Sequence, residues 1–143
     1  VRTFCPGGES EVPLSPSMRE DIQHQMSTLP AQYHFDIPDK VYEPVRTPTC
    51  PSGLRGRMAV FEVLEMSSEI ESIVLSNPVE SKLWSSARSQ GMMTMREDAI
   101  LKAFDKKVPF SEINNLSSIM LANDEIPKIE TEPAAKGEST EAK

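Results

Sequence analysis

The sequence has little of what several classes of protein require. Of its 143 residues, 6% are aromatic and only two are cysteines, which do not make a disulfide framework. No apolar run approaches the ~20 residues that span a bilayer, and no basic start followed by an apolar block resembles a signal peptide. The net charge is −7 without a basic stripe, which argues against nucleic-acid binding because phosphate neutralisation needs clustered cations. We therefore expect a cytosolic protein.

A phosphate-binding loop is also missing from the sequence. Cradling of nucleotide phosphates uses the pattern G-x-x-x-x-G-K-[ST], whose backbone N–H groups and lysine meet the phosphates. None of the six glycines is followed by the Lys-Ser/Thr pair. We expect that this chain does not hydrolyse ATP by itself.

Proline, by contrast, is abundant: twelve residues, clustered in residues 6–51 and near the end, argue against long regular elements there. Residues 1–5 alternate in polarity and predict a short strand. Residues 6–16 predict a loop. A short helix is expected to start at Ser17 and end before Pro30, and residues 30–56 predict an irregular, hairpin-like excursion. The apolar stripe of that helix is Met18, Ile22 and Met26.

Stronger signals follow from Arg57 onward. Residues 57–64 are apolar on both faces and predict an interior strand of a covered sheet. Helix-start signals come next, and Gly91 is placed to end a helix in the left-handed conformation. After Leu121 the composition cannot support a core, so we expect residues 122–143 to be a disordered tail. The expected helix starts are Ser68 with Glu71, Asn77–Pro78 with Glu80, Thr94 with Glu97, and Ser111, whose helix would carry a stripe of Ile113, Leu116 and Met120.

Two stretches of the sequence resemble the end of the type II secretion and type IV pilus assembly ATPases. They are CPSGLRGRMAVFEVL at 50–64 and GMMTMREDAILKAFDKKVPFSEI at 91–113. The resemblance rests on both motifs occurring in the family's order, and it covers roughly residues 1–120. It favours assembly or secretion motors over retraction motors. The matching residues are Gly56–Arg57 and Glu62–Val63–Leu64 in the first stretch, and Gly91–Met92, Thr94, Arg96, Glu97 and Asp98 in the second, with Met95 in place of leucine; the opening VRTFC also matches.

The resemblance implies an α+β fragment, made of late strands of a RecA-like α/β ATPase sheet followed by a small C-terminal helical domain. Residues 1–56 would hold an end strand of the RecA-like domain and a degenerate metal-binding subdomain. Residues 57–121 would hold the closing strand and the helical domain. The rest of the sheet, with the phosphate loop, would lie upstream of Val1.

The same resemblance implies a parent motor that binds ATP and Mg²⁺ as a homo-hexamer at the cytoplasmic face of the inner membrane. The partners would be its own upstream ATPase core, neighbouring subunits and the inner-membrane platform protein. Secretion, pilus assembly and DNA uptake are not separated by these motifs. The alternative is a free-standing interaction module, non-enzymatic, in which the helices at 68–120 bind another motor component.

Zinc is the cofactor that the resemblance brings into question. The family often holds one zinc ion with two C-x-x-C pairs, since four thiolates complete a closed tetrahedron. Here each pair keeps only its first cysteine, Cys5 or Cys50. A glycine, Gly8 or Gly53, stands three residues later, where the second cysteine would be. We expect that zinc has been lost and that both cysteines are free thiols. The alternative is a small zinc protein in which His24 and His34 join the two cysteines in a Cys₂His₂ set. Metal analysis of the purified chain would distinguish the two hypotheses.

The charged residues of the motifs have structural explanations that we favour over chemical ones. Arg55 and Arg57 are expected to pair with nearby acids, with a structural hinge or a phosphate contact between subunits as the alternatives for Arg57. Glu62 is expected to pair with Arg57 or another cation, because an unpaired buried carboxylate is costly. Glu97 and Asp98 lie in a helix first turn, where acids cap and oppose the macrodipole. We therefore expect no catalytic or cofactor-binding residue in this chain.

The larger apolar side chains of the motifs are expected to fill the core. Met-rich surfaces can bind partner helices, but packing between helices is the interpretation that we favour. The same holds for the single tryptophan, which lies on a helical stripe. These residues are Met66, Met92, Met93, Met95 and Trp84.

Overall fold

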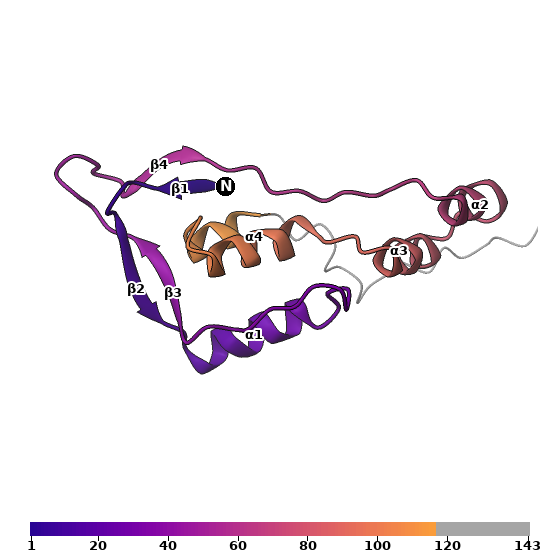
Figure 1. Cartoon of the computed structure of the whole chain (residues 1–143), viewed down its shortest axis with the longest axis horizontal. Coiled ribbons are helices and arrows are strands. Elements are labelled where there is room, and N and C mark those ends of the chain that lie inside the picture. Colours follow the sequence, from indigo (N-terminus) through magenta and orange to yellow (C-terminus); the bar gives the residue numbers. More distant parts are fainter. Residues whose placement is uncertain (117–143) are drawn as a thin grey trace, which may run out of the picture.

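The computed structural model describes residues 1–116 and shows a small α+β arrangement with two two-stranded sheets (Figure 1). The predicted tail 122–143 and the predicted stripe residue Met120 lie outside the described residues. In chain order the elements are β1 (Arg2–Phe4), β2 (Glu9–Pro13), α1 (Pro16–Met26), β3 (Lys40–Pro44), β4 (Leu54–Arg57), α2 (Ser68–Ser76), α3 (Glu80–Ser89), α4 (Met95–Phe104) and the 3₁₀ helix η1 (Phe110–Asn115).

The strand β1 agrees with the prediction for residues 1–5, but the hairpin-like pair β2–β3 was only partly foreseen. Strand β2 lies where the sequence predicted a loop, and it pairs antiparallel with β3 from Glu9↔Pro44 to Pro13↔Lys40. A cross-strand contact supports the pairing, since Glu11 accepts from Lys40 Nζ at 2.7 Å. The pairing joins residues about thirty positions apart, so local periodicity does not reveal it.

The prediction of a strand at 57–64 is wrong. Strand β4 ends at Arg57, and residues 58–66 have no strand pairing. Pairing stops where β1 does, because β1 is three residues long. The last bonds between the two segments join Val1 and Met58: Met58 N–H donates to the Val1 carbonyl at 2.8 Å, and the Val1 amino group donates to the Met58 carbonyl at 3.0 Å. A strand needs a neighbour to bond its N–H and C=O groups, and the described residues provide none beyond this point.

The starts of α1, α2 and α3 are shifted by one or two residues from the predicted ones, whereas α4 is capped by Thr94 as predicted. Ser15 rather than Ser17 caps α1, and its Oγ accepts from Met18 N–H at 3.2 Å. Ser67 caps α2 in the same way. Helix α3 begins at Glu80 without a side-chain cap, two residues later than its Pro78 start signal suggested. Shifts of this size are usual for helix ends.

The end of α3 is as predicted at Gly91, whose φ of +97° lies in the left-handed region. Met92 N–H donates to the Ala87 carbonyl and Gly91 N–H to the Arg88 carbonyl, both at 3.0 Å. These two bonds form a Schellman motif, which satisfies carbonyls at the helix end. The turn therefore delivers the chain directly into α4.

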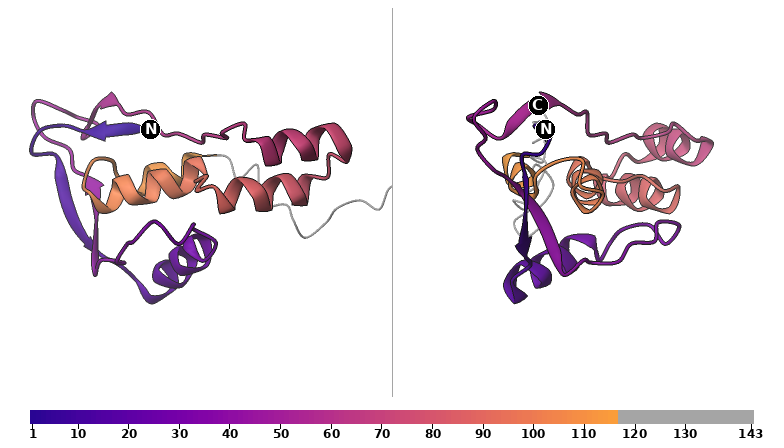
Figure 2. Two further views of the ribbon diagram at one scale, coloured as in Figure 1. Left: turned by 45° about the vertical axis from the view of Figure 1, so that its right-hand side comes forward. Right: turned by 60° about the vertical axis from the view of Figure 1, so that its left-hand side comes forward.

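Helix α4 lies at the centre of the molecule, between the β1–β4 sheet on one side and α1 on the other, while α2 and α3 project beyond it (Figures 1 and 2). The predicted fourth helix at Ser111 is the 3₁₀ helix η1, in which Ile113 is buried. None of the helices found in residues 1–116 has the length and apolar character that crossing a membrane requires. The main core cluster consists of Ile22, Met26, Ala99, Ile100, Ala103, Val108 and Ile113.

The first strand is anchored to η1 by an ion pair between Arg2 and Glu112. The Glu112 side chain is 7% exposed and accepts from Arg2 Nη2 at 2.6 Å and from the Arg2 backbone N–H at 2.9 Å. Burial of the Glu112 carboxyl raises its pKa, but the hydrogen bonds and charge of Arg2 outweigh this, and the net pKa lies below its usual range. The pair thus closes a contact between the two ends of the described chain.

Candidate functional site: the junction of the two motifs

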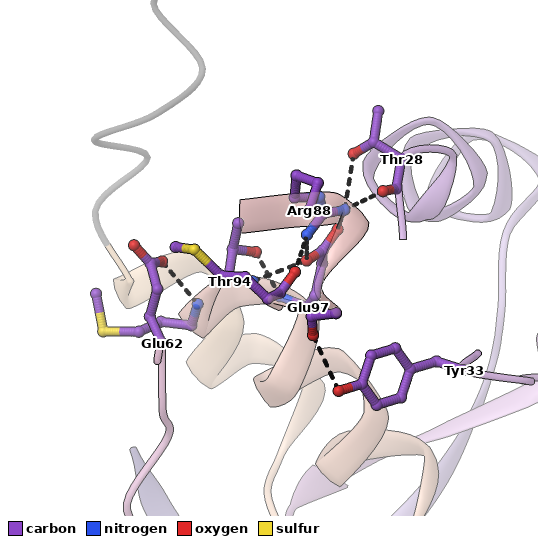
Figure 3. Close-up of polar contacts among 9 residues, drawn as sticks. Thr28, Tyr33, Glu62, Arg88, Thr94 and Glu97 are labelled. Atoms are coloured by element: carbon purple, nitrogen blue, oxygen red, sulfur yellow. Dashed lines mark hydrogen bonds and ion pairs between the residues drawn. The ribbon is translucent and has the colours of Figure 1, made fainter. Parts of the chain in front are cut away.

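The N-terminus of α4 is capped by three polar side chains. Thr94 Oγ1 accepts from Glu97 N–H at 3.1 Å, and Glu97 Oε2 accepts from Thr94 N–H at 2.8 Å, which is the predicted capping box. Glu62, from the other motif, accepts from Met95 N–H at 3.1 Å (Figure 3). In the first turn of α4, the N–H groups of Met95 and Glu97 are therefore met by side chains from the two motif stretches.

A second set of contacts joins α4 to the extended segment 58–66. Asp98 Oδ2 accepts from Phe61 N–H at 2.8 Å and also forms an ion pair with Lys102, one turn later on α4. Lys102 Nζ in turn donates to the Ala59 carbonyl at 3.0 Å and lies 5.2 Å from the centre of the Phe61 ring. The segment that follows β4 is thus attached to α4 through its Ala59 carbonyl and its Phe61 N–H, which bond to Lys102 and Asp98 of the helix.

The ion pair between Arg88 and Glu97 is the most buried charge pair of this region. Its side chains are 10% and 4% exposed, and Nη1–Oε2 and Nη2–Oε1 are both 2.7 Å. Such a two-pronged arrangement fits the planar guanidinium to the carboxylate. Arg88 Nη1 also donates to the Met92 carbonyl at 2.8 Å, and the Trp84 ring lies 5.4 Å from the guanidinium. Buried charges persist when paired in this way.

The loop after α1 completes the junction. The second terminal nitrogen of Arg88 donates to the backbone carbonyl of Thr28 and, at 3.2 Å, to its Oγ1. Tyr33 O–H donates to the Gly91 carbonyl at 3.0 Å (Figure 3). Residues 88–98, which run from the last turn of α3 into α4, therefore contact the loop after α1 and the segment 58–66. We call this set of contacts the α4 junction.

The structure settles several expectations about the motif residues. Glu97 is a capping residue, as predicted, and Asp98 also serves a structural contact. Glu62 does not pair with Arg57 but caps α4, so that expectation is wrong. Arg55 and Arg57 are exposed, and neither forms an ion pair with a described residue, which contradicts the expected acid partners. The side chain of Arg88 was not singled out, because one arginine in a last helical turn gives no local sign of a partner nine residues on.

The apolar motif residues are less buried than expected. Trp84 is half-buried beside Arg88 rather than enclosed in the core. Met92 and Met93 are half-buried, whereas Met66 and Met95 are exposed. The interpretation of these methionines as core filling is therefore wrong for two of the four.

The two cysteines are not free thiols, which corrects another expectation. Cys5 and Cys50 form a disulfide, with Cα atoms 6.6 Å apart. That separation lies within the range that a disulfide spans. The sequence could not show this, because 44 residues lie between the two cysteines and only the turns of the fold bring them together.

The residues present do not fit a zinc site. Within residues 1–116, no group of three or more His, Cys, Asp or Glu side chains is placed to hold a metal ion. Both thiols that a tetrahedral site would use are joined to each other, and Gly8 and Gly53 supply no ligand. The histidines His24 and His34 are exposed.

What the α4 junction can do chemically follows from its partners. Its carboxylates accept hydrogen bonds from backbone N–H groups or from guanidinium and ammonium groups. These contacts fix the orientation of α4 relative to the segments around it. The junction is a mechanical connection between segments that are distant in the sequence.

Comparisons with known proteins identify relatives of this chain. No protein-family model matches it. The type IV pilus assembly ATPase PilB of Pseudomonas aeruginosa is 26% identical over 78 residues, which cover 54% of this chain and 14% of that protein. The type II secretion system protein E of Xanthomonas campestris pv. campestris is 32% identical over 73 residues, which cover 51% of this chain and 13% of that protein.

PilB of Acinetobacter baylyi is 25% identical over 79 residues, which cover 55% of this chain. In each comparison the chain covers less than a sixth of the relative's length, 13% to 14%. The three relatives come from two assembly systems, type IV pili and type II secretion. The chain is related to the assembly ATPases of type IV pili and type II secretion systems.

Proposed function

We propose that this chain is the C-terminal portion of a hexameric ATPase that powers pilin or pseudopilin assembly or protein secretion. The observation that carries the proposal is the α4 junction. The two stretches that resemble the assembly ATPases, 50–64 and 91–113, contact each other through Glu62, Asp98 and Lys102. Motif residues that hold two segments together are what a force-transmitting part of a motor requires.

The segment 58–66 supports a place for this chain beside a larger sheet. It is extended, carries no strand pairing and leaves Phe61 and Val63 61% and 66% exposed. Large apolar side chains at this density on an unpaired segment mark a surface that another element covers. We propose that the covering element is the RecA-like sheet of the same motor, against which this segment would pack.

The motor's nucleotide chemistry would be performed outside this chain. ATP and Mg²⁺ require a phosphate loop, and the sequence printed here has none. We assign no catalytic residue to residues 1–116. Their proposed role is to couple the nucleotide-driven movement of the upstream core to its partners.

The projecting pair of helices α2 and α3 is the proposed partner surface. Leu75 of α2 is 79% exposed and Val74 beside it is also exposed, while Ile70 and Ile73 of the same helix are more buried. Glu71 is exposed one turn before Leu75 and adds negative charge beside it, so the partner would be apolar and basic. We propose a neighbouring subunit of the hexamer or the platform protein at the cytoplasmic face of the inner membrane.

The reading frame upstream of Val1 provides the test. We expect it to encode an in-frame G-x-x-x-x-G-K-[ST], and we expect the purified product of the whole frame to hydrolyse ATP. The 143-residue chain alone should show no hydrolysis above background, and removal of these residues from the whole product should abolish assembly. Hydrolysis by the 143-residue chain alone would overturn the proposal. A frame that starts with this chain would instead favour the free-standing interaction module.

A further inference from the structure

We propose that the Cys5–Cys50 disulfide is a reversible cross-link that stands in place of a metal between two matching turns. Each turn has the sequence Cys-Pro-x-Gly, at residues 5–8 and 50–53. In each, the glycine N–H donates to the carbonyl of the cysteine three residues earlier, at 2.8 Å for Gly8 and 3.0 Å for Gly53. The two turns thus present one sulfur each to a common point, and the bond Cys5 Sγ–Cys50 Sγ joins them.

The cross-link lies where the two sheets meet. The turn 5–8 connects β1 to β2, and the turn 50–53 leads into β4, at the end of the molecule opposite α2 (Figure 1). Backbone bonds run between the same turns and the loop after β3: Cys5 N–H donates to the Gly53 carbonyl at 3.0 Å, and Val45 N–H to the Gly8 carbonyl at 2.7 Å. The disulfide is the covalent cross-link in this set of contacts, so its loss leaves the two turns joined to each other only by hydrogen bonds.

The two glycines show that this turn pair is not a metal site that lacks only its ion. A Cβ atom added at Gly53 would lie 2.7 Å from the Val45 carbonyl oxygen and 2.9 Å from the Val45 nitrogen, and the φ of Gly53 is +71°. A cysteine cannot occupy that position without moving the backbone of the neighbouring loop. At Gly8 the added Cβ would be 3.2 Å from the Cys5 Cβ, which is also tight. The backbone has therefore closed over the space that a thiol at position 53 would need.

The exposure of the two cysteine residues indicates how the bond would be opened. Cys5 is 3% exposed, whereas Cys50 is half-buried and is flanked by the exposed residues Pro51 and Ser52. A thiolate of an external dithiol reaches Cys50 Sγ, forms a mixed disulfide with it, and Cys5 Sγ leaves with the electron pair and takes up a proton. The second thiol of the reagent then displaces the Cys50 thiol and completes a disulfide in the reagent. The protein bond gains two electrons and two protons, and an oxidised dithiol reverses the exchange.

Reversibility follows from the proposed cytoplasmic position of the motor, although the cross-link itself does not depend on it. Cytosolic thiols are kept reduced, and the disulfides that form there are mostly transient and redox-sensing. Oxidation would fix the β1–β4 sheet against the β2–β3 sheet, and reduction would release the chain between the cysteines, which are 45 positions apart. The contact between the two sheets would therefore be rigid when the disulfide is formed and looser when it is reduced.

The test uses the 143-residue chain after exposure to oxidised glutathione, with intact-mass analysis after alkylation and hydrogen exchange with and without dithiothreitol. We expect two alkyl groups to add only after reduction. Reduction should also speed amide exchange in β1, β2 and residues 45–57 by roughly tenfold, with no change in α2 and α3. Alkylation of both cysteines without reductant, or equal exchange in the two states, would overturn the proposal.

Two controls separate this result from simpler ones. A variant with Cys5→Ser and Cys50→Ser should exchange at the reduced rate whether or not dithiothreitol is present, which removes any direct effect of the reagent. Zinc added to the reduced wild-type chain should not protect the cysteines from alkylation. Stoichiometric zinc that blocks alkylation would show that the turns hold a metal, and the replacement would be wrong. None of these readouts involves ATP hydrolysis, so failure here leaves the proposed motor role intact.

Discussion

The two terminal nitrogens of Arg88 face the two carboxylate oxygens of Glu97, with both N–O distances at 2.7 Å. Arg88 is in the last turn of α3 and Glu97 in the first turn of α4, so the pair spans the turn between the helices. Glu97 also accepts from Thr94 N–H. One carboxylate therefore closes a helix cap and fixes the direction in which the next helix leaves.

Replacement of Arg88 by alanine should lower the free energy of unfolding by about 3 kcal/mol, because the buried Glu97 carboxylate would lose its cationic partner. Arg88→Lys should recover part of that loss, since an ammonium keeps the charge but not the two-pronged geometry. Urea unfolding followed by circular dichroism measures both. The exposed Arg46→Ala change should stay within about 0.5 kcal/mol of the wild type. Equal midpoints for Arg88→Ala and Arg46→Ala would show that the pair contributes nothing.

Local signals in the sequence were sufficient to predict much of the α4 junction. The capping box at Thr94 and Glu97 and the left-handed end at Gly91 depend on residues within four positions of each other, and both are confirmed. Such features are decided by backbone groups that the side chains can reach without help from the rest of the fold.

Features that depend on distant partners were not predicted. The strand expected at 57–64 fails because its partner β1 is short, and the disulfide was missed because only the tertiary fold brings Cys5 to Cys50. Arg88 and Glu62 illustrate the same limit on charged residues. Each finds a partner on another element, and neither has a local pattern that names it.

Two further substitutions test how the motifs are joined, and each should act on a different amide. Asp98→Ala removes the acceptor for Phe61 N–H and should speed exchange of that amide roughly fivefold to tenfold, as expected for a charged hydrogen bond. Glu62→Ala removes the acceptor for Met95 N–H and should speed exchange there by a similar factor. Amide exchange followed by nuclear magnetic resonance separates the two positions.

The control for this pair is Glu65→Ala, because Glu65 is exposed and is near Glu62 in the sequence. It should change neither amide. If Asp98→Ala and Glu62→Ala accelerated both amides equally, the contacts would not be separate and the junction would open as one unit.

The Arg2–Glu112 pair predicts acid sensitivity. The pKa of Glu112 is below its usual range in the folded protein: burial raises it, but the Arg2 contacts lower it more. A carboxyl with a lowered folded pKa contributes stability above its unfolded pKa, about 4.3, and loses it as pH falls through the folded pKa. Stability should therefore decline below about pH 4.5, and Glu112→Gln should flatten that decline. Urea midpoints from neutral pH to pH 3 measure it.

A matched control is Glu11, whose pKa is also lowered, by hydrogen bonds from Lys40 and then Tyr42. Its side chain is exposed, so its contribution to the free energy of unfolding should shrink in 0.5 M salt, where the Debye length is only a few Å and exposed charges are screened. The contribution of the enclosed Glu112 should persist in the same salt. An acid decline that is unaltered in Glu112→Gln would contradict the assignment.

Val63→Lys distinguishes a surface of this chain from a surface of the assembled motor. Val63 is 66% exposed, so the substitution should change the free energy of unfolding of the 143-residue chain by less than about 0.5 kcal/mol. In the whole reading frame the same residue would face the proposed sheet, where a buried, unpaired ammonium costs several kcal/mol. We therefore expect the full product carrying Val63→Lys to lose hexamer formation and ATP hydrolysis. The matched change Val45→Lys, at another exposed valine outside the segment 58–66, should leave both intact. Full activity of the Val63→Lys product would mean that no sheet covers this segment, because a lysine would be tolerated there only in contact with water.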